Sequence, residues 1–360
     1  MRSIGLIGAG WVTQHHLRGW QRLGDRARVV AVADPNKSAR ELRAAEFGIP
    51  RTYASAAELL ANERIDAVDV EVPREHHAGV CLLAAKRGLP ILCQKPLAPT
   101  LAEAQALVRG VGKRSRLMVH ENWRFRTHYL LIKKWLEQGR VGRVRQAIMT
   151  VLTSGLVPGA DGRMYAVERQ PFFATEKRLL LMEVLIHHVD CLRFLLGDLA
   201  LDGARLGKSC AKIAGEDRVM LMMTGGGGEG VALVGDFMAH GYPPGQFDRL
   251  EILGDEGTIR LEGTTLQSIG KTPETLEVDH QANYINAYEG VFRHFLDCLD
   301  SGRPFDTRPE DNLKTLAICE RAYRTGLFKA RTAKPAPRRG AASRAPTPAR
   351  RGSTRRSSRR

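Results

Sequence analysis

Three ionisable side chains lie at helical spacing within an apolar segment of the chain, residues 179–196. Glu183, His187 and Asp190 occupy positions i, i+4 and i+7, so an α-helix would carry them on one face. An imidazole that titrates near neutrality, with a carboxylate that orients it, can exchange a proton with a hydroxyl group. A buried polar pair that serves only packing fits the same spacing. No third ligand is spaced for a metal ion, so we predict no metal site.

A lysine beside an apolar run is a second candidate. Lys95 stands just past the run Ile91–Cys93, and Pro96 and Pro99 stiffen the loop behind it. At the carboxyl end of a parallel strand, such a lysine would project into the crevice where ligands bind. A surface lysine at the start of a loop has the same spacing, and the pattern alone leaves both interpretations open.

The first thirty-four residues have the pattern of a dinucleotide-binding unit. An apolar strand leads into the turn Gly8-Ala9-Gly10, a helical stretch follows, and a second apolar strand ends at Asp34. Gly8 permits a tight turn, and Gly10 leaves room for a pyrophosphate that faces the free N–H groups of the helix. Asp34 is expected to accept hydrogen bonds from ribose hydroxyls. Thr13 stands where the fingerprint normally has glycine or alanine, which weakens the motif.

The alternation of strands and helices defines the fold class. Residues 1–121 alternate between the two, which predicts an α/β domain of the Rossmann type: a doubly wound parallel sheet with helices on both faces. Residues 122–328 combine helices with short strands separated by glycine-rich turns, which predicts an α+β domain on a largely antiparallel open sheet. The strands expected in this second domain span residues 144–153, 219–223, 231–237, 250–253 and 258–261.

The positive charge of the chain is concentrated at its C-terminal end. Residues 329–360 hold twelve Lys or Arg and no Asp or Glu, so only +4 of the net +16 belongs to residues 1–328. The segment has no apolar bulk to bury, and its composition predicts a disordered basic tail. Such a tail is either merely solvated or contacts a polyanion such as nucleic acid.

The composition also indicates where in the cell the protein is expected. No apolar stretch approaches the ~20 residues of a membrane span, and no secretory leader precedes the first strand. The six cysteines form no Cys-x-x-Cys pair. We therefore expect a cytoplasmic protein with reduced thiols and no membrane contact.

Five short motifs follow one another in a fixed order. They are the turn Gly8–Gly10, the segments Pro73–His77 and Cys93–Leu97, the crossover Glu121–Phe125 and the helix Glu183–Asp190. In this order they resemble the motifs of the glucose-fructose oxidoreductase, inositol dehydrogenase and MocA (Gfo/Idh/MocA) family of nicotinamide-dependent enzymes. The resemblance runs from the first strand to about residue 329.

The resemblance implies a role for single residues. Lys95 would contact the nicotinamide ribose and the reacting hydroxyl, His187 would accept the proton during oxidation, and Glu183 would help to hold substrate and imidazole. The implied cofactor-binding residues are Gly8, Gly10, Trp11, Val12, Asp34, Pro73, His77, Gln94 and Lys95. The implied substrate-binding residues are Asn122, Arg124, Glu183 and Asp190.

Three positions depart from the family pattern. Gln94 replaces the usual glutamate and removes a charge beside Lys95, Glu183 replaces the more usual aspartate, and Arg74 stands where asparagine is common. None of these changes abolishes the chemistry. Together they argue against copying a substrate from any one member.

The sequence therefore predicts an NAD-dependent dehydrogenase or reductase. We expect it to move hydride between NAD(H) and a secondary alcohol or ketone carbon of a sugar, cyclitol or related polyol. Asp34 favours NAD over NADP, and the resemblance implies a homodimer or homotetramer. Two alternatives are a non-redox, glycosidase-like enzyme that uses NAD transiently and an NAD(H)-binding regulatory protein whose tail contacts nucleic acid. The presence of Lys95 and His187 argues against the regulatory protein.

Overall fold

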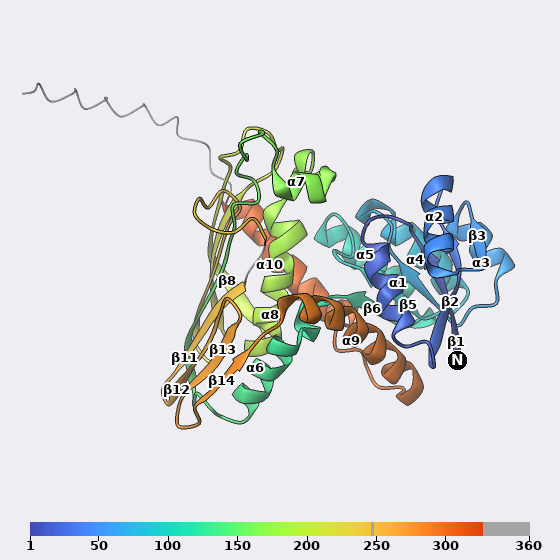
Figure 1. Cartoon of the computed structure of the whole chain (residues 1–360). Coiled ribbons are helices and arrows are strands. Elements are labelled where there is room, and N and C mark those ends of the chain that lie inside the picture. The colour runs from blue at the N-terminus through green and yellow to red at the C-terminus, as the bar shows by residue number, and fades with distance from the viewer. Residues whose placement is uncertain (246–247, 327–360) are drawn as a thin grey trace, which may run out of the picture. The chain divides into compact units, whose positions relative to one another are not determined.

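Six parallel strands form the first of two sheets in the computed structural model, which describes residues 1–245 and 248–326 (Figure 1). Their order is β3-β2-β1-β4-β5-β6, and it changes direction between β1 and β4. At such a switch point, the crevice outside the carboxyl ends of the strands receives ligands. The strands are β1 (Arg2–Ile7), β2 (Ala27–Ala33), β3 (Arg51–Tyr53), β4 (Ala67–Val70), β5 (Ile91–Gln94) and β6 (Leu117–His120).

Helices connect these strands and begin at short polar side chains. Asn36, Ser55 and Thr100 each accept a backbone N–H of the first helical turn, at the start of the second, third and fifth helices. The α/β alternation predicted for residues 1–121 is confirmed. The helices are α1 (Thr13–Gln21), α2 (Lys37–Phe47), α3 (Ala56–Asn62), α4 (His77–Lys86) and α5 (Leu101–Val111), with the 3₁₀ turns η1 (Arg74–His76), η2 (Gly112–Arg114) and η3 (Trp123–Phe125).

The second sheet has eight strands in the order β14-β13-β12-β11-β7-β10-β9-β8. Only the β7–β10 pair is parallel, so the predicted largely antiparallel sheet is confirmed. In β9, buried and exposed residues alternate, which shows that one face of the sheet is covered. The strands are β7 (Val144–Leu152), β8 (Leu199–Gly207), β9 (Arg218–Gly225), β10 (Gly230–Asp236), β11 (Asp248–Gly254), β12 (Gly257–Glu262), β13 (Thr265–Gly270) and β14 (Glu274–Glu277).

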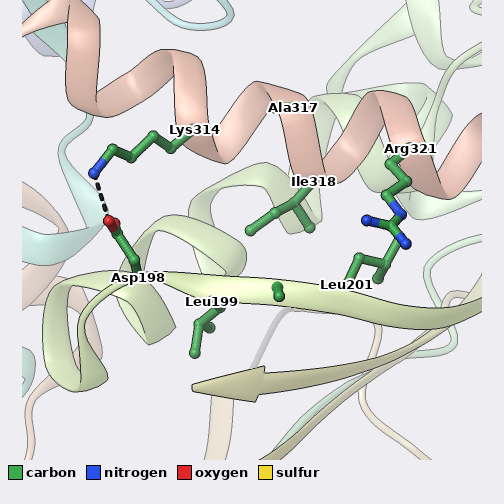
Figure 2. Close-up of a pocket in the computed structure, with 8 residues that line it drawn as sticks. Asp198, Leu199, Leu201, Lys314, Ala317, Ile318 and Arg321 are labelled. Carbon is green, nitrogen blue, oxygen red and sulfur yellow. Dashed lines mark hydrogen bonds and ion pairs between the residues drawn. The ribbon is translucent and has the colours of Figure 1, made fainter. Parts of the chain in front are cut away.

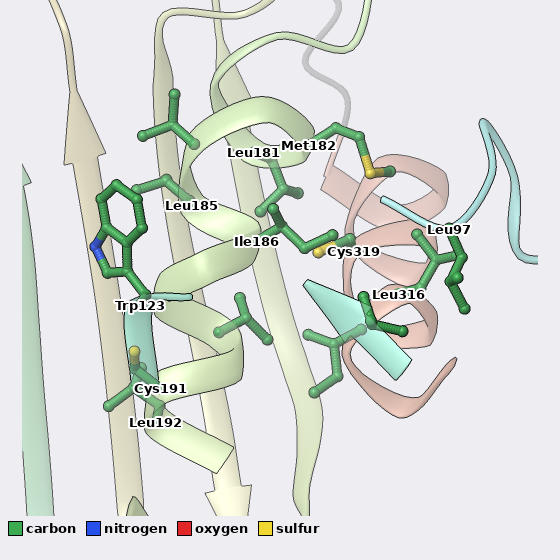
Figure 3. Close-up of a cluster of buried hydrophobic side chains, with 14 of the residues drawn as sticks. Leu97, Trp123, Leu181, Met182, Leu185, Ile186, Cys191, Leu192, Leu316 and Cys319 are labelled. Atoms are coloured by element: carbon green, nitrogen blue, oxygen red, sulfur yellow. The ribbon is translucent and has the colours of Figure 1, made fainter. Parts of the chain in front are cut away.

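Helices α6, α8 and α10 lie along one face of this sheet (Figure 1). Leu316 and Cys319 of α10 belong to the same buried cluster as Ile186 and Leu192 of α8, so α8 has its apolar contacts on several sides (Figure 3). The helices of this half are α6 (Thr127–Glu137), α7 (Tyr165–Arg169), the 3₁₀ turn η4 (Pro171–Ala174), the π-helical segment η5 (Leu180–Leu185), α8 (Ile186–Leu196), α9 (His280–Ser301) and α10 (Pro309–Gly326).

Helix α9 packs against α1 of the first sheet. The Phe292 ring stacks on Trp20, with centroids 4.2 Å apart, and Arg26 forms ion pairs with Asp297 and Asp300. Residues 1–326 all lie in one compact unit. The domain boundary expected after residue 121 therefore stays a prediction. In the folded protein, α9 thus completes the core of the first sheet, although it lies far from these strands in the sequence.

Two further expectations concern the tail and the membrane. The predicted basic tail, residues 329–360, lies outside the described residues. Within residues 1–326, apart from the two left undescribed, no helix has the length and apolar character that a bilayer crossing requires. All six cysteines are buried and free.

Candidate active site

A cleft of about 1200 Å³ lies at the carboxyl ends of the first sheet. One wall comes from the turns after β1, β2, β4 and β5, and the other from α7, η4, η5 and the start of α8. The structure thus brings together residues that are far apart in the sequence. The predicted site residues that line the cleft are Gly10, Trp11, Val12, Asp34, Pro73, His77, Gln94, Lys95, Asn122, Glu183 and His187.

The glycine turn has the geometry that a dinucleotide requires. Gly8 has φ +114°, and a Cβ there would stand 2.5 Å from the carbonyl oxygen of Glu71. A Cβ at Gly10 would meet nothing within 4 Å, so the backbone stays open to the cleft. Asp34 fixes the turn, because its Oδ2 accepts the N–H of Ala9 at 2.8 Å. These residues fit a bound pyrophosphate and its adenosine ribose.

Thr13 occupies the third fingerprint position without disturbing the turn. Its side chain is buried, and its hydroxyl donates to the carbonyl oxygen of Gly8 at 3.4 Å. Two arginines flank the same region: Arg40 donates to the carbonyl oxygen of Asp34 at 2.9 Å, and Arg43 donates to that of Gly10 at 3.3 Å. Threonine in place of glycine at position 13 thus adds a side-chain hydrogen bond to the turn.

Lys95 reaches across the cleft to the opposite wall. Its Nζ donates to the main-chain oxygen of Glu183 at 2.8 Å and lies 3.6 Å from Glu183 Oε2. Behind it, Gln94 Oε1 accepts the Lys95 N–H at 2.8 Å, and Gln94 Nε2 lies 3.2 Å from His16 Nε2. Gln94 therefore anchors the backbone that carries the lysine.

Glu183 is held by two cations from the first half of the chain. Besides Lys95, Arg74 donates from Nη1 to Glu183 Oε1, and its Nη2 lies 2.6 Å from Glu176 Oε1. Two of the departures from the family pattern, Arg74 and Glu183, are thus partners in one ion pair. The pair joins the segment after β4 to η5.

The partner of His187 is a different carboxylate from the expected one. His187 Nδ1 contacts Glu121 Oε1, and the imidazole stacks on Trp123 with centroids 4.2 Å apart and planes 13° apart. Across the described part of the chain, no hydrogen bond joins Glu183 to His187. The Glu183 carboxylate contacts Arg74 instead and lies 3.6 Å from Lys95 Nζ.

Burial controls the protonation of this pair. Burial lowers the pKa of His187, and the Lys95 ammonium lowers it further. Burial also raises the pKa of Glu121 to about 7. Glu121 lies just past β6 within the crossover motif, and the sequence pattern alone predicts no role for it. Its position at a strand's carboxyl end is the signal that could have identified it.

Arg124 and Asp190, both expected to bind substrate, form an ion pair with each other. Arg124 donates from Nε and Nη2 to the two carboxylate oxygens of Asp190, at 2.7 and 2.6 Å, and both residues are buried. Neither belongs to the cleft lining, and Arg124 also contacts Asp311. The two charges neutralise each other behind the site. Of the crossover residues expected to bind substrate, Asn122 lines the cleft.

His77 serves as a tie between two loops. Its ring nitrogens each lie 2.9 Å from a carbonyl oxygen, that of Val72 on one side and that of Pro96 on the other. The residue lines the cleft, but these main-chain oxygens occupy its polar atoms. It positions the loops that follow β4 and β5.

A buried polar cluster lies beneath the cleft. His16 Nδ1 is 3.0 Å from both Asp69 Oδ2 and Glu71 Oε1, and Trp20 donates to Asp69 at 2.8 Å. Their ligand atoms are close enough together for a metal ion. Although burial opposes the charge, the Glu71 and Asp69 carboxylates raise the pKa of His16 to about 10. The imidazolium thus supplies the positive charge that the carboxylates require.

A smaller hollow of about 300 Å³ lies between β8 and α10 (Figure 2). Its floor is apolar, with Leu199, Leu201 and Ile318, and an ion pair between Asp198 and Lys314 closes one end. It contains no histidine and no carboxylate free of that ion pair, so it offers no group for proton transfer. The larger cleft is the candidate active site.

Comparison with known proteins agrees with this geometry. Residues 2–122 match the oxidoreductase family with an NAD-binding Rossmann fold, and residues 129–260 match the GFO/IDH/MocA C-terminal domain. D-apiose dehydrogenase from Paraburkholderia graminis is 31% identical over 349 residues, which cover 88% of this chain and 86% of that protein. Inositol 2-dehydrogenase from Rhizobium meliloti is 27% identical over 335 residues, covering 89% and 96%.

A solved structure shows the same arrangement. An oxidoreductase from Agrobacterium radiobacter in complex with NAD+, L-tartaric acid and magnesium superimposes with a TM-score of 0.83 and 29% identity, covering 90% of this chain and 96% of that one. The family follows from the two matched domains, their order and the glycine turn. The chain belongs to the Gfo/Idh/MocA family of NAD-binding oxidoreductases.

Proposed function

We propose that this protein is an NAD-dependent dehydrogenase that oxidises a secondary alcohol group of a sugar, cyclitol or related polyol, or reduces the corresponding ketone. The observation that carries the proposal is the placement of Lys95 and His187 on one cleft, beside the dinucleotide turn. An ammonium group and a neutral imidazole are the two groups that oxidation of an alcohol needs, one to hold the oxygen and one to take its proton.

Each residue of the cleft then has a task. NAD supplies the hydride acceptor when it is bound to the turn at Gly8 and to Asp34. Lys95 holds the alcohol oxygen, and His187 Nε2 takes the hydroxyl proton as the carbonyl forms. The main-chain oxygen of Glu183 keeps Lys95 in place, and its carboxylate accepts a hydrogen bond from a neighbouring substrate hydroxyl. Asn122, just past β6, offers an amide to the same cleft.

The walls of the cleft suit a compact polyhydroxylated substrate. Tyr165 and Phe172, each 47% exposed, line it beside the polar groups and offer apolar faces to the C–H side of a sugar ring. Relatives with known names are dehydrogenases of D-apiose and inositol, which supports the same class here. The departures at Arg74 and Glu183 support a substrate that differs from theirs in detail.

Turnover of a substrate panel tests the proposal. Purified protein is assayed against aldoses, cyclitols, polyols and sugar acids with NAD and NADP, and NADH formation is followed, with Lys95→Met as the inactive control. Reduction of NAD with at least one member of the panel is expected. A product formed without net NADH would favour a glycosidase-like reaction, and tight NAD binding without any turnover would favour a regulatory protein.

We extend the proposal to assembly and setting. Met220 and Met222 are 52% and 63% exposed on β9, which supports a homodimer or homotetramer formed through the open face of the second sheet. A cytoplasmic location agrees with the free cysteines, and the basic tail is a candidate contact for nucleic acid. Light scattering of wild type and of a Met222→Glu variant tests the assembly, which should weaken in the variant.

A further inference from the structure

Glu121 is a fully buried carboxylate that the proposed reaction does not yet use. It is 0% exposed at the end of β6, and its Oε1 contacts Nδ1 of His187. The second oxygen, Oε2, is also buried and has no hydrogen-bond partner in the described part of the chain. A buried carboxylate with one unsatisfied oxygen is costly, so its retention beside the imidazole requires an explanation.

The imidazole of His187 is clamped in one plane. Trp123 stacks on it at 4.2 Å and 13°, and the Arg126 guanidinium lies 3.7 Å from the centroid of the Trp123 ring. The carboxylate of Glu121 then selects the rotation within that plane. With Nδ1 at the carboxylate, Nε2 is the ring nitrogen left for the cleft that His187 lines.

We propose that Glu121 is the positioning residue of His187: its carboxylate accepts a hydrogen bond from Nδ1–H, which leaves Nε2 unprotonated and able to accept the hydroxyl proton of the substrate. The proposal rests on the dehydrogenase function argued above and assigns to Glu121 the orienting role first expected of Glu183. Glu183 is committed to Arg74 and Lys95.

The charge of Glu121 matters as much as its position. When Nε2 takes the proton, an imidazolium forms near Lys95, and burial already lowers the pKa of His187. The carboxylate offsets both effects, so it makes His187 a stronger base than it would be alone. Other titratable groups that face the pair are Lys95 from the loop after β5, His120 of β6, Arg124 and Arg126 beyond it, His188, Asp190 and Cys191 of α8, and Cys319 of α10.

Glu121→Gln separates charge from shape, because the amide oxygen can still accept the Nδ1–H. In polyol oxidation, kcat should fall roughly 10- to 100-fold while the Kd for NAD stays within about twofold. Wild-type kcat/KM should fall as pH drops through the titration of the pair. In Glu121→Gln, the base is weaker, so this acid limb should move to lower pH. Glu229→Gln is the matched control, since Glu229 is 8% exposed and lies outside the cleft lining.

A readout without turnover keeps the inference separate from the proposed function. Ring-nitrogen NMR of histidine-labelled protein, assigned by difference with His187→Gln, should show Nδ1 protonated and Nε2 unprotonated in wild type. In Glu121→Gln, whose amide oxygen can still accept a hydrogen bond from Nδ1–H, this tautomer should persist. In Glu121→Leu, which offers no acceptor, the proton should shift toward Nε2. If the Gln variant does not fold, the Asp variant is measured in its place.

Two outcomes would overturn the inference. One is a Glu121→Gln variant that loses activity while the acid limb of its kcat/KM–pH profile is unchanged. That result would mark Glu121 as a structural residue only. The other is a wild-type NMR spectrum with Nε2 protonated. A protein that turns over no polyol but shows the predicted tautomer would refute the dehydrogenase and leave the positioning role standing.

Discussion

Lys95 Nζ donates to the main-chain oxygen of Glu183 at 2.8 Å, across the cleft from the strand that carries it. The bond places a cation of the first sheet against the segment that precedes His187. Because a main-chain oxygen accepts it, substitution of the Glu183 side chain does not remove this bond. The lysine is therefore positioned independently of the carboxylate that lies 3.6 Å away.

Substitution of either proton-handling residue should depress turnover far more than cofactor binding. Lys95→Ala and His187→Ala should each lower kcat by roughly 10² to 10⁴, the range for a positioned acid–base group. Steady-state kinetics with NAD titration by fluorescence measures both quantities. A His187→Ala variant with the wild-type rate would remove the proposed general base.

Replacement of Glu183 by Gln should cost less than either of these changes. Arg74 keeps its contact with Glu176, Lys95 keeps its main-chain acceptor, and the amide can still hydrogen-bond a substrate hydroxyl. We expect roughly a tenfold loss in kcat/KM, carried mostly by KM. A loss as large as that of His187→Ala would show that the carboxylate itself takes part in the chemistry.

NAD should bind at least tenfold more tightly than NADP. Asp34 is held at the cleft by the N–H groups of Ala9 and Asn36, so a 2′-phosphate would meet a fixed negative charge. Arg40 lies close enough to reduce the penalty but donates to a main-chain oxygen. Calorimetric titration with both cofactors measures the ratio, and Asp34→Asn should bring it closer to one. Equal affinities in the wild type would contradict the argument.

Removal of residues 331–360 should leave kcat and KM within about twofold, because the composition of this segment offers nothing to pack. If the tail binds nucleic acid, the affinity of the full chain should fall steeply with salt and the truncated chain should not bind. A large loss of turnover on truncation would instead place the tail in the active assembly.

Much of the fold follows from local patterns, whereas part of the site does not. The turn at Gly8 and Gly10 and the strand that ends at Asp34 are encoded within a few dozen residues, and the structure has the predicted elements there. The partner of His187 is different, because Glu121 lies 66 positions earlier. No periodicity within one helix can identify a partner that the fold supplies from another strand.

Partners supplied from other segments account for further differences. The spacing of Glu183 and His187 predicts that they share a helix face, but the Glu183 carboxylate is bound by Arg74 and lies beside Lys95, both from the first half of the chain. Buried Arg124 and Asp190 have the residue types of a binding site, but they satisfy each other. Strands β3, β8, β13 and β14 are not predicted from the sequence, and three of them, β3, β8 and β14, lie at the edges of their sheets.

Truncation of Phe292 should destabilise the whole protein. Its ring is 0% exposed and stacks on Trp20, so Phe292→Ala should cost about 3–5 kcal/mol of unfolding free energy. Chemical denaturation measures the loss, and Leu130→Ala, at a side chain that is 46% exposed, is the control. A loss below about 1 kcal/mol would show that α9 is not needed for the core of the first sheet.

The stacking of Phe292 on Trp20 also bears on how the protein is made. During synthesis, the six strands of the first sheet leave the ribosome long before α9. The face of α1 that carries Trp20 therefore stays exposed to solvent until nearly 300 residues have emerged. The cofactor half is therefore not a detachable module. Cutting the gene after residue 122 should yield a polypeptide with a bare aromatic patch, prone to aggregation and dependent on chaperones.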